Sequence, residues 1–235
     1  MKIRAFYIIA ITFFSIHCVS AQKVKVDFII KNDSLPKREK NNFIYLDHNT
    51  NISTARYIGR VKSTGKINDI NLAIIFISDK AKKKGANAFK YVDFKNKDGI
   101  AEIVLDAYVI DENLEKSNED FLPKNKIYLF GRDNINRNEA EEYKLNGEVR
   151  SVEPFKYAVS DFDKEMTISK GKAFGTTLKL KPRDSESVFI NFTGFGASPN
   201  YMPAGGVGIS FSGGNIIRMD RNTGLLLTHI FARQE

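Results

Sequence analysis

Histidine is the first side chain to consider for chemistry, because a neutral imidazole can act as an acid, a base or a metal ligand near pH 7. The chain contains three histidines, His17, His48 and His229. His48 follows Asp47 in a polar stretch, and His229 lies in an apolar, strand-like run. Residues 196–200 match part of the Gly-x-Ser-x-Gly motif of serine hydrolases but lack its final glycine. The sequence therefore predicts no catalytic residue and a protein that is not an enzyme.

Two carboxylates, Asp161 and Asp163, alternate around Phe162. On a strand this spacing places both on one face, where they can ligate a cation or serve as acid and base. No third partner accompanies them in the pattern, so we interpret both as solvated side chains. A carboxylate-dependent hydrolase of envelope glycans is the alternative that the pair keeps open.

Two stretches resemble metal-binding or cofactor-binding motifs but lack residues that these motifs require. Residues 133–139 resemble a calcium loop, but Glu139 stands where the loop requires glycine and Leu145 where it requires a carboxylate. Residues 194–196 begin like a dinucleotide-binding loop, but Pro199 replaces its third glycine and no helix is expected to follow. We predict no metal site and no cofactor.

An aromatic, glycine-rich segment is the best candidate for binding. Residues 192–212 carry large side chains among glycines and two prolines, a composition suited to a loop that presents aromatic faces to a sugar or a peptide. Packing of the same side chains at the edge of a β-sandwich is the alternative. The predicted contact surface consists of Phe195, Tyr201, Met202 and Phe211.

The first 21 residues have the pattern of a secretory signal peptide. Lys2 and Arg4 form a basic start, residues 5–16 are apolar, and residues 19–21 supply small side chains for cleavage before Gln22. The apolar run is shorter than the roughly 20 residues that a helix needs to cross a bilayer. We expect an extracytoplasmic protein, located in the periplasm, at the periphery of the outer membrane or outside the cell, with no transmembrane span.

Cleavage would remove Cys18, the only cysteine. Lipidation of Cys18 is the alternative, although His17 and Ser15 stand where bacterial lipoprotein signals carry a small and a leucine-like residue. Without another cysteine the chain forms no disulfide, so burial of apolar side chains must stabilise it. Its hydrophobic content of 42% agrees with a folded globule.

The chain is basic, with a net charge of +8 that falls to +6 when Lys2 and Arg4 are removed. A secreted protein has little access to nucleic acid, so its polyanionic partners would be envelope glycans or lipid phosphates. The densest basic run, Lys80 with residues 82–84, lies at the end of a predicted helix, where cations complement the helix dipole. An anion-binding patch is the alternative for this run.

A helix over residues 70–81 is the clearest element, because apolar side chains recur at helical spacing and Gly85 supplies a left-handed stop. We expect this one helix to lie on an antiparallel sheet, which makes residues 22–120 an α+β region. The strands expected in the sheet are one over residues 24–30, a strand pair over 43–46 and 56–61, and a hairpin of 88–94 with 100–110 that turns at Asp98-Gly99.

A mainly β, sandwich-like region is expected over residues 121–235, after a charged connection at residues 111–126. Ten of the sixteen glycines lie at or beyond Gly171, between short apolar runs. This pattern is typical of short strands joined by glycine turns. The expected elements are strands over 176–180 and 188–192, a hairpin of 207–211 with 216–219, and a final apolar run over 225–231 that docks the C-terminus.

Residues 80–88 carry a resemblance to known proteins. Their sequence, Lys-Ala-Lys-Lys-Lys-Gly-Ala-Asn-Ala, resembles the helix exit of small envelope lipoprotein domains, in which Gly-Ala-Asn-Ala leads from a helix into a strand. The Ala21-Gln22 start and the Lys/Asn/Ile-rich composition also resemble secreted Bacteroidetes proteins. The resemblance implies that Gly85 ends the helix and that Ala86 and Ala88 let the next strand pack closely. It implies no active-site residue.

The sequence thus predicts a secreted, non-enzymatic protein that binds or assembles with cell-envelope components. Its expected partner is an envelope protein or an anionic glycan or lipid surface, and not nucleic acid. A glycan hydrolase is one alternative. The other is an outer-membrane-associated β protein, whose spanning strands would need about nine to eleven residues each.

Overall fold

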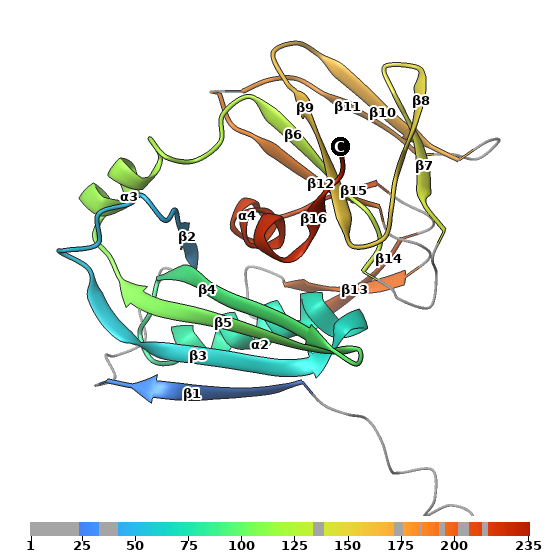
Figure 1. Cartoon of the computed structure of the whole chain (residues 1–235). Coiled ribbons are helices and arrows are strands. Elements are labelled where there is room, and N and C mark those ends of the chain that lie inside the picture. Colours follow the sequence, from blue (N-terminus) through green and yellow to red (C-terminus); the bar gives the residue numbers. More distant parts are fainter. Residues whose placement is uncertain are drawn as a thin grey trace, which may run out of the picture.

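The computed structural model describes most of the chain, and Figure 1 shows the arrangement of its elements. Side chains are described for residues 24–32, 42–133, 139–171, 176–183, 185–192 and 216–235, and the backbone alone for 196–201 and 207–212. The expected signal peptide, residues 1–21, lies outside the described residues, as do Phe195 and Met202.

The described residues form a β-rich, mixed α+β structure, which confirms this part of the predicted fold class. The first sheet has the strand order β1 (Lys25–Lys31), β3 (Arg56–Lys66), β5 (Ile100–Val109), β4 (Ala88–Lys97) and β2 (Ile44–Leu46). The helices are η1 (Ile67–Asp69), α2 (Ile70–Lys82), α3 (Glu112–Asn118) and α4 (Arg221–Ile230).

Two further sheets and a ribbon follow in the chain. The central sheet has the order β15 (Ile216–Arg218), β12 (Val188–Phe192), β6 (Lys126–Phe130), β9 (Lys156–Asp161) and β16 (Ala232–Arg233). The outer sheet has the order β11 (Thr176–Leu180), β10 (Met166–Lys170), β7 (Glu141–Leu145) and β8 (Glu148–Val152). The ribbon pairs β13 (Gly196–Tyr201) with β14 (Val207–Ser212).

The β4–β5 hairpin turns at the predicted dipeptide. Asp98 and Gly99 have positive φ angles of 53° and 76°, as in the two-residue turns that match the twist of the flanking strands. Along β5, the residues from Ala101 to Ala107 alternate between buried and half-buried side chains. One face of the first sheet therefore lines a core.

The predicted helix is α2, which follows the short η1. Gly85 has a φ of 89° just after it, a left-handed conformation that favours glycine, and β4 then begins at the fully buried Ala88. The buried side chains of α2 belong to the same hydrophobic cluster as side chains of β3 and β5. These helix residues are Ile70, Ala73, Ile74, Ile77 and Ala81.

The predicted pairing of residues 43–46 with 56–61 is wrong. β2 pairs in parallel with β4, where Tyr45 lies opposite Phe89, and β3 pairs with β1 and β5 instead. The first sheet is therefore mixed rather than antiparallel. Alternation of apolar residues reveals which face of a strand is buried, but it does not select the neighbouring strand.

The C-terminal apolar run is helical, although its sequence predicts a strand. The Asp220 carboxylate accepts a hydrogen bond from the backbone N–H of Thr223 at 2.9 Å and so caps the first turn of α4. Leu225, Leu226 and Leu227 are all buried. Periodicity cannot distinguish a short buried helix from a buried strand when consecutive residues are apolar.

The central sheet is buried on both faces. From β6, Ile127 and Leu129 pack in a cluster with residues of the outer sheet, whereas Phe130 packs in the cluster that contains α4. In β12, Ile190 packs in the cluster with the outer sheet, and Phe189 packs in the cluster that contains α4. A strand covered on both faces is expected to be continuously apolar, and β12 is buried at all its positions.

Two other expectations in this half of the chain are corrected. The hairpin of 207–211 with 216–219 does not form, because β14 pairs with β13 and β15 pairs with β12. The connection at 111–126 contains α3, whose first turn is capped by the side chain of Asp111. Glycines mark the ends of strands without specifying which strands pair.

Figure 1 shows α4 between the first sheet and the central sheet. A Cβ atom on Gly224 would lie 2.3 Å from Cγ of Phe189, so the helix backbone lies directly on β12. Leu226 of α4, Phe189 of β12 and Phe89 of β4 belong to one hydrophobic cluster. The division into regions 22–120 and 121–235 stays a prediction, and one core draws side chains from both.

Candidate functional site

A groove opens between α2 and the beginning of α4, with a volume of about 500 Å³. Small-molecule sites typically measure roughly 300–1,000 Å³. Most of its apolar lining belongs to the main core cluster, so the groove borders core side chains. The apolar lining residues are Phe43, Ile74, Ile75, Ile77, Phe89, Leu105 and Leu226, and all except Ile75 belong to this cluster.

The lining comes from segments far apart in sequence. Phe43 precedes β2 and stacks on Phe89 of β4, with ring centroids 4.7 Å apart. Ile74 and Ile77 belong to the buried stripe of α2, and Leu226 belongs to α4. The groove therefore exists only when both helices lie against the first sheet.

The rim of the groove is polar, and its charged groups have partners. Lys82 Nζ lies 3.9 Å from the carboxylate of Asp79, and the carboxylate of Asp220 caps α4. The side-chain oxygen of Asn222 accepts the backbone N–H of Tyr45 at 2.9 Å, which ties α4 to β2. The other polar residues of the rim are Asn42, Ser78 and Thr223.

Tyr45 also links β2 to the last turn of α4. Its hydroxyl lies 2.7 Å from Nε2 of His229. The His229 ring stacks on Tyr91 of β4, with ring centroids 4.6 Å apart. Both ends of α4 are thus held against β2 by polar contacts with one tyrosine.

Burial raises the pKa of the Tyr45 hydroxyl, and the nearby Asp47 carboxylate acts in the same direction. Burial also lowers the pKa of His229. Both shifts favour the uncharged forms at pH 7. The pair therefore forms a neutral hydrogen bond rather than an activated nucleophile.

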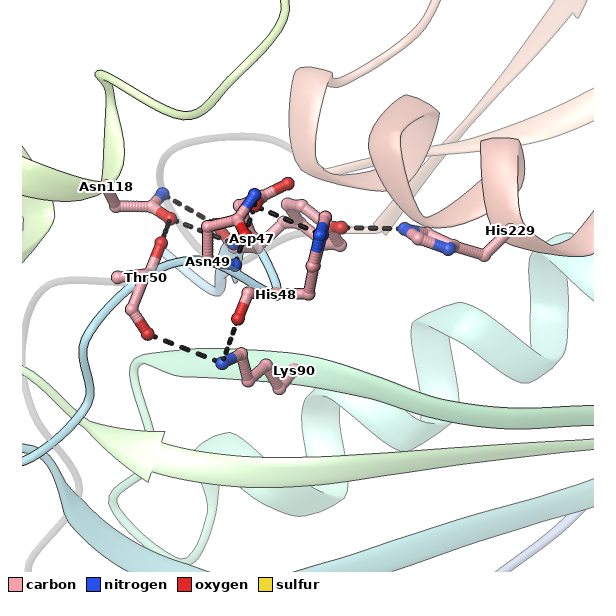
Figure 2. A network of polar contacts seen from close by, with 8 residues as sticks. Asp47, His48, Asn49, Thr50, Lys90, Asn118 and His229 are labelled. Atoms are coloured by element: carbon pink, nitrogen blue, oxygen red, sulfur yellow. Dashed lines mark hydrogen bonds and ion pairs between the residues drawn. The ribbon is translucent and has the colours of Figure 1, made fainter.

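A polar network fixes the loop that follows β2 (Figure 2). The amide nitrogen of the fully buried Asn118 donates to the carbonyl of Tyr45 at 2.9 Å. The amide oxygen of Asn118 accepts from the backbone N–H of Asp47 at 2.9 Å and the hydroxyl of Thr50 at 2.6 Å. Lys90 Nζ donates to the carbonyl of His48 at 3.1 Å. The network satisfies buried polar groups, which is a structural role.

The structure does not describe the side chains of the predicted contact surface. Phe195 and Met202 lie outside the described residues. Tyr201 ends β13, and Phe211 lies in β14 opposite Ala197. A shared surface of these four residues stays a prediction.

Asp161 and Asp163 both face solvent. Asp161 ends β9 and forms an ion pair with Lys126, whose hydrogen bond holds the pKa of Asp161 below its ordinary value. Asp163 follows the strand and is exposed, while Phe162 between them is buried. The prediction of solvated carboxylates agrees with this exposure.

Within the described residues, no group of three or more histidine, cysteine or acidic side chains is positioned to hold a metal ion. Residues 134–138 of the calcium-loop-like stretch lie outside the description. No helix in the described part of the chain has the length and apolarity needed to cross a membrane. In the basic run, Lys80 donates to the carbonyl of Val26, and Lys82 pairs with Asp79.

Sequence reasoning also missed a buried ionic cluster that joins the segment after β6 to β7 and β10. Glu141 is only 3% exposed and forms ion pairs with both Arg132 and Lys170. The Lys170 ammonium lies 5.6 Å from the centre of the Phe192 ring. Two cations therefore depend on one buried carboxylate.

No family model matches the chain, and neither a curated protein nor a solved structure matches it. The groove itself escaped the sequence analysis because Tyr45 and Asn222, which fix its position, are 177 residues apart. The sequence contains one signal for the helix α4. Asp220 precedes Thr223 at the spacing of an N-terminal cap, which indicates that a helix begins there.

Proposed function

We propose that the protein is a non-enzymatic, extracytoplasmic binding protein whose groove between α2 and α4 takes the apolar part of an envelope amphiphile. One observation carries this proposal: the groove opens onto Phe43, Phe89 and Leu226, which belong to the buried core. Burial of apolar ligand surface there would contribute roughly 25 cal/mol per Å² before the costs of association.

The rim favours a ligand whose polar part is uncharged. Asp79 and Lys82 neutralise each other, and the positive end of the α4 dipole faces the carboxylate of Asp220. Ser78, in contrast, offers a hydroxyl for hydrogen bonding. Hydroxyl or amide groups on the ligand therefore suit this rim better than a phosphate or an ammonium group.

The proposed location supports the same function. Residues 1–21 have the pattern of a signal peptide, and a protein outside the cytoplasm meets envelope amphiphiles directly. The proposal treats residues 22–120 as a helix-on-sheet unit, with α2 on one face of the first sheet. α4, which belongs to the other region, supplies the second wall of the groove.

Fluorescence of Nile red, an uncharged apolar dye, tests the proposal. The dye should become brighter with the wild-type protein, and dodecyl maltoside below its critical micelle concentration should displace it. Ser78→Trp puts a bulky ring into the groove and should abolish this signal. Leu72→Trp is the matched control, because Leu72 is an exposed residue of the same helix outside the groove lining.

The variants separate the groove from the rest of the surface. Loss of the dye signal in Ser78→Trp but not in Leu72→Trp, at equal melting temperatures, would support the groove. An unchanged signal in Ser78→Trp, or no binding by the wild type, would contradict the proposal.

A further inference from the structure

A second cleft lies at the end of β1 and the start of β3, on a different part of the first sheet. Its volume is about 660 Å³, and its lining residues are Lys31, Asn32, Arg56 and Tyr57. None of these residues lines the groove between α2 and α4. The cleft is therefore separate from that groove, and only the extracellular source of its ligand rests on the location in the proposed function.

The tyrosine that helps to line this cleft is fixed in position. The Tyr57 hydroxyl donates to Oδ1 of Asp106 at 2.9 Å, and Arg60 donates two hydrogen bonds of 2.8 Å to the same carboxylate. The Tyr57 ring lies against Tyr108, with ring centroids 5.3 Å apart. Burial and the hydrogen bond to Asp106 raise the pKa of Tyr57 to about 12. The ring is therefore neutral and preorganised at physiological pH.

Two positively charged side chains line the cleft. Lys31 and Arg56 are both exposed, and neither forms an ion pair with another described residue. The Asp106 carboxylate already serves Arg60 and Tyr57. A guanidinium with a nearby ammonium suits a carboxylate, because charge-assisted hydrogen bonds to such groups are short and strong.

Asn32 adds an uncharged polar group with a defined position. Its backbone N–H donates to the carbonyl of Ile58 at 3.0 Å, and its side-chain nitrogen lies 3.5 Å from the carbonyl of Tyr57. The amide oxygen of Asn32 can accept a hydrogen bond from a sugar hydroxyl, because a carboxamide oxygen has two acceptor sites.

From these groups we propose that the cleft binds an acidic sugar unit of an extracellular polysaccharide. The sugar carboxylate contacts Arg56 and Lys31, a hydroxyl contacts Asn32, and the sugar ring lies beside Tyr57. A neutral sugar lacks the group that the two cations bind. A simple inorganic anion lacks the ring and the hydroxyls.

Calorimetric titration with tri-galacturonate tests this site, with galactotriose and inorganic phosphate as comparison ligands. We expect tri-galacturonate to bind with an affinity that falls as salt is added, and to bind more tightly than either comparison ligand. The double variant Lys31→Gln/Arg56→Gln should lower the affinity by at least about tenfold, since it removes two charge-assisted contacts.

The matched control is Lys144→Gln/Lys179→Gln, which removes the same charge from two exposed lysines of the outer sheet. This control should bind tri-galacturonate like the wild type. Equal losses in the two double variants would overturn the site, because the effect would then come from net charge alone. Binding of phosphate as tightly as tri-galacturonate would overturn the acidic-sugar assignment. Equal binding of galactotriose would overturn the role of the two cations.

Discussion

The first sheet and the central sheet differ in how their two faces are covered. The first sheet has one face in the main core. Part of its other face packs in a smaller hydrophobic cluster with Leu46, Ala88 and Tyr108, and the rest carries half-exposed ion pairs such as Arg60–Asp106 and Lys62–Glu102. The central sheet has the outer sheet on one face and α4 on the other. These ion pairs of the first sheet therefore reach water, whereas the ionic cluster between the central and outer sheets needs its partners inside the protein.

This difference explains where each kind of site arises. The half-open first sheet leaves room for a groove beside α2 and a cleft beside Tyr57. The space between the central and outer sheets instead contains Glu141 with two cations, Arg132 and Lys170. Both hollows on which the proposals rest therefore lie beside the first sheet.

The largest expected effect comes from Glu141→Gln, which removes the carboxylate shared by Arg132 and Lys170. Breaking a buried ion pair leaves an uncompensated charge and costs about 3–5 kcal/mol of unfolding free energy. Urea denaturation measures this loss. Glu142→Gln, at the exposed next position of β7, is the control and should be close to wild type. A loss below 1 kcal/mol, as for an exposed pair, would remove the contrast between the two sheets.

A smaller loss is expected from Gly224→Ala at the contact between α4 and β12. Alanine normally stabilises a helix relative to glycine by about 1 kcal/mol, but here the added Cβ would lie 2.3 Å from Cγ of Phe189. Overpacking should reverse the sign and destabilise the protein by about 1–3 kcal/mol. Thermal and urea unfolding measure the change.

Phe189→Leu in the Gly224→Ala background should recover part of the loss, because it removes ring atoms from the clash. A double-mutant cycle measures this coupling. Additive effects of the two substitutions would show that residue 224 of α4 and Phe189 of the central sheet are not energetically coupled.

The smallest expected effect concerns pH and His229. Because burial lowers the pKa of His229 below its ordinary 6.5, the unfolded state binds more protons than the folded state just below that pH. Stability from the neutral histidine is therefore complete above pH 6.5 and decreases as the pH falls. His229→Gln removes the titrating group, so the stability difference between wild type and variant should shrink between pH 7.5 and 5. A difference that stays constant over this range would contradict the assignment.

Sequence patterns succeeded where one face of an element meets water. α2 and the β4–β5 hairpin follow from periodicity with Gly85, Asp98 and Gly99 at their ends. They failed where consecutive residues are buried, as in α4, whose three adjacent leucines carry no period that distinguishes helix from strand. The sequence also did not predict which strands pair, because the pairing of β2 with β4 depends on tertiary packing. The groove could not be predicted for the same reason, since it needs the contact of Asn222 with Tyr45.

The most direct measurement of the central claim is a titration of the isotope-labelled protein with dodecyl maltoside below its critical micelle concentration, followed by NMR. The account predicts chemical-shift changes concentrated in α2, in the first two turns of α4 and at Phe43 just before β2, with Phe89 of β4 and Leu226 of α4 among the most affected residues. Changes confined to the outer sheet, or no changes at all, would contradict a ligand-binding groove between α2 and α4.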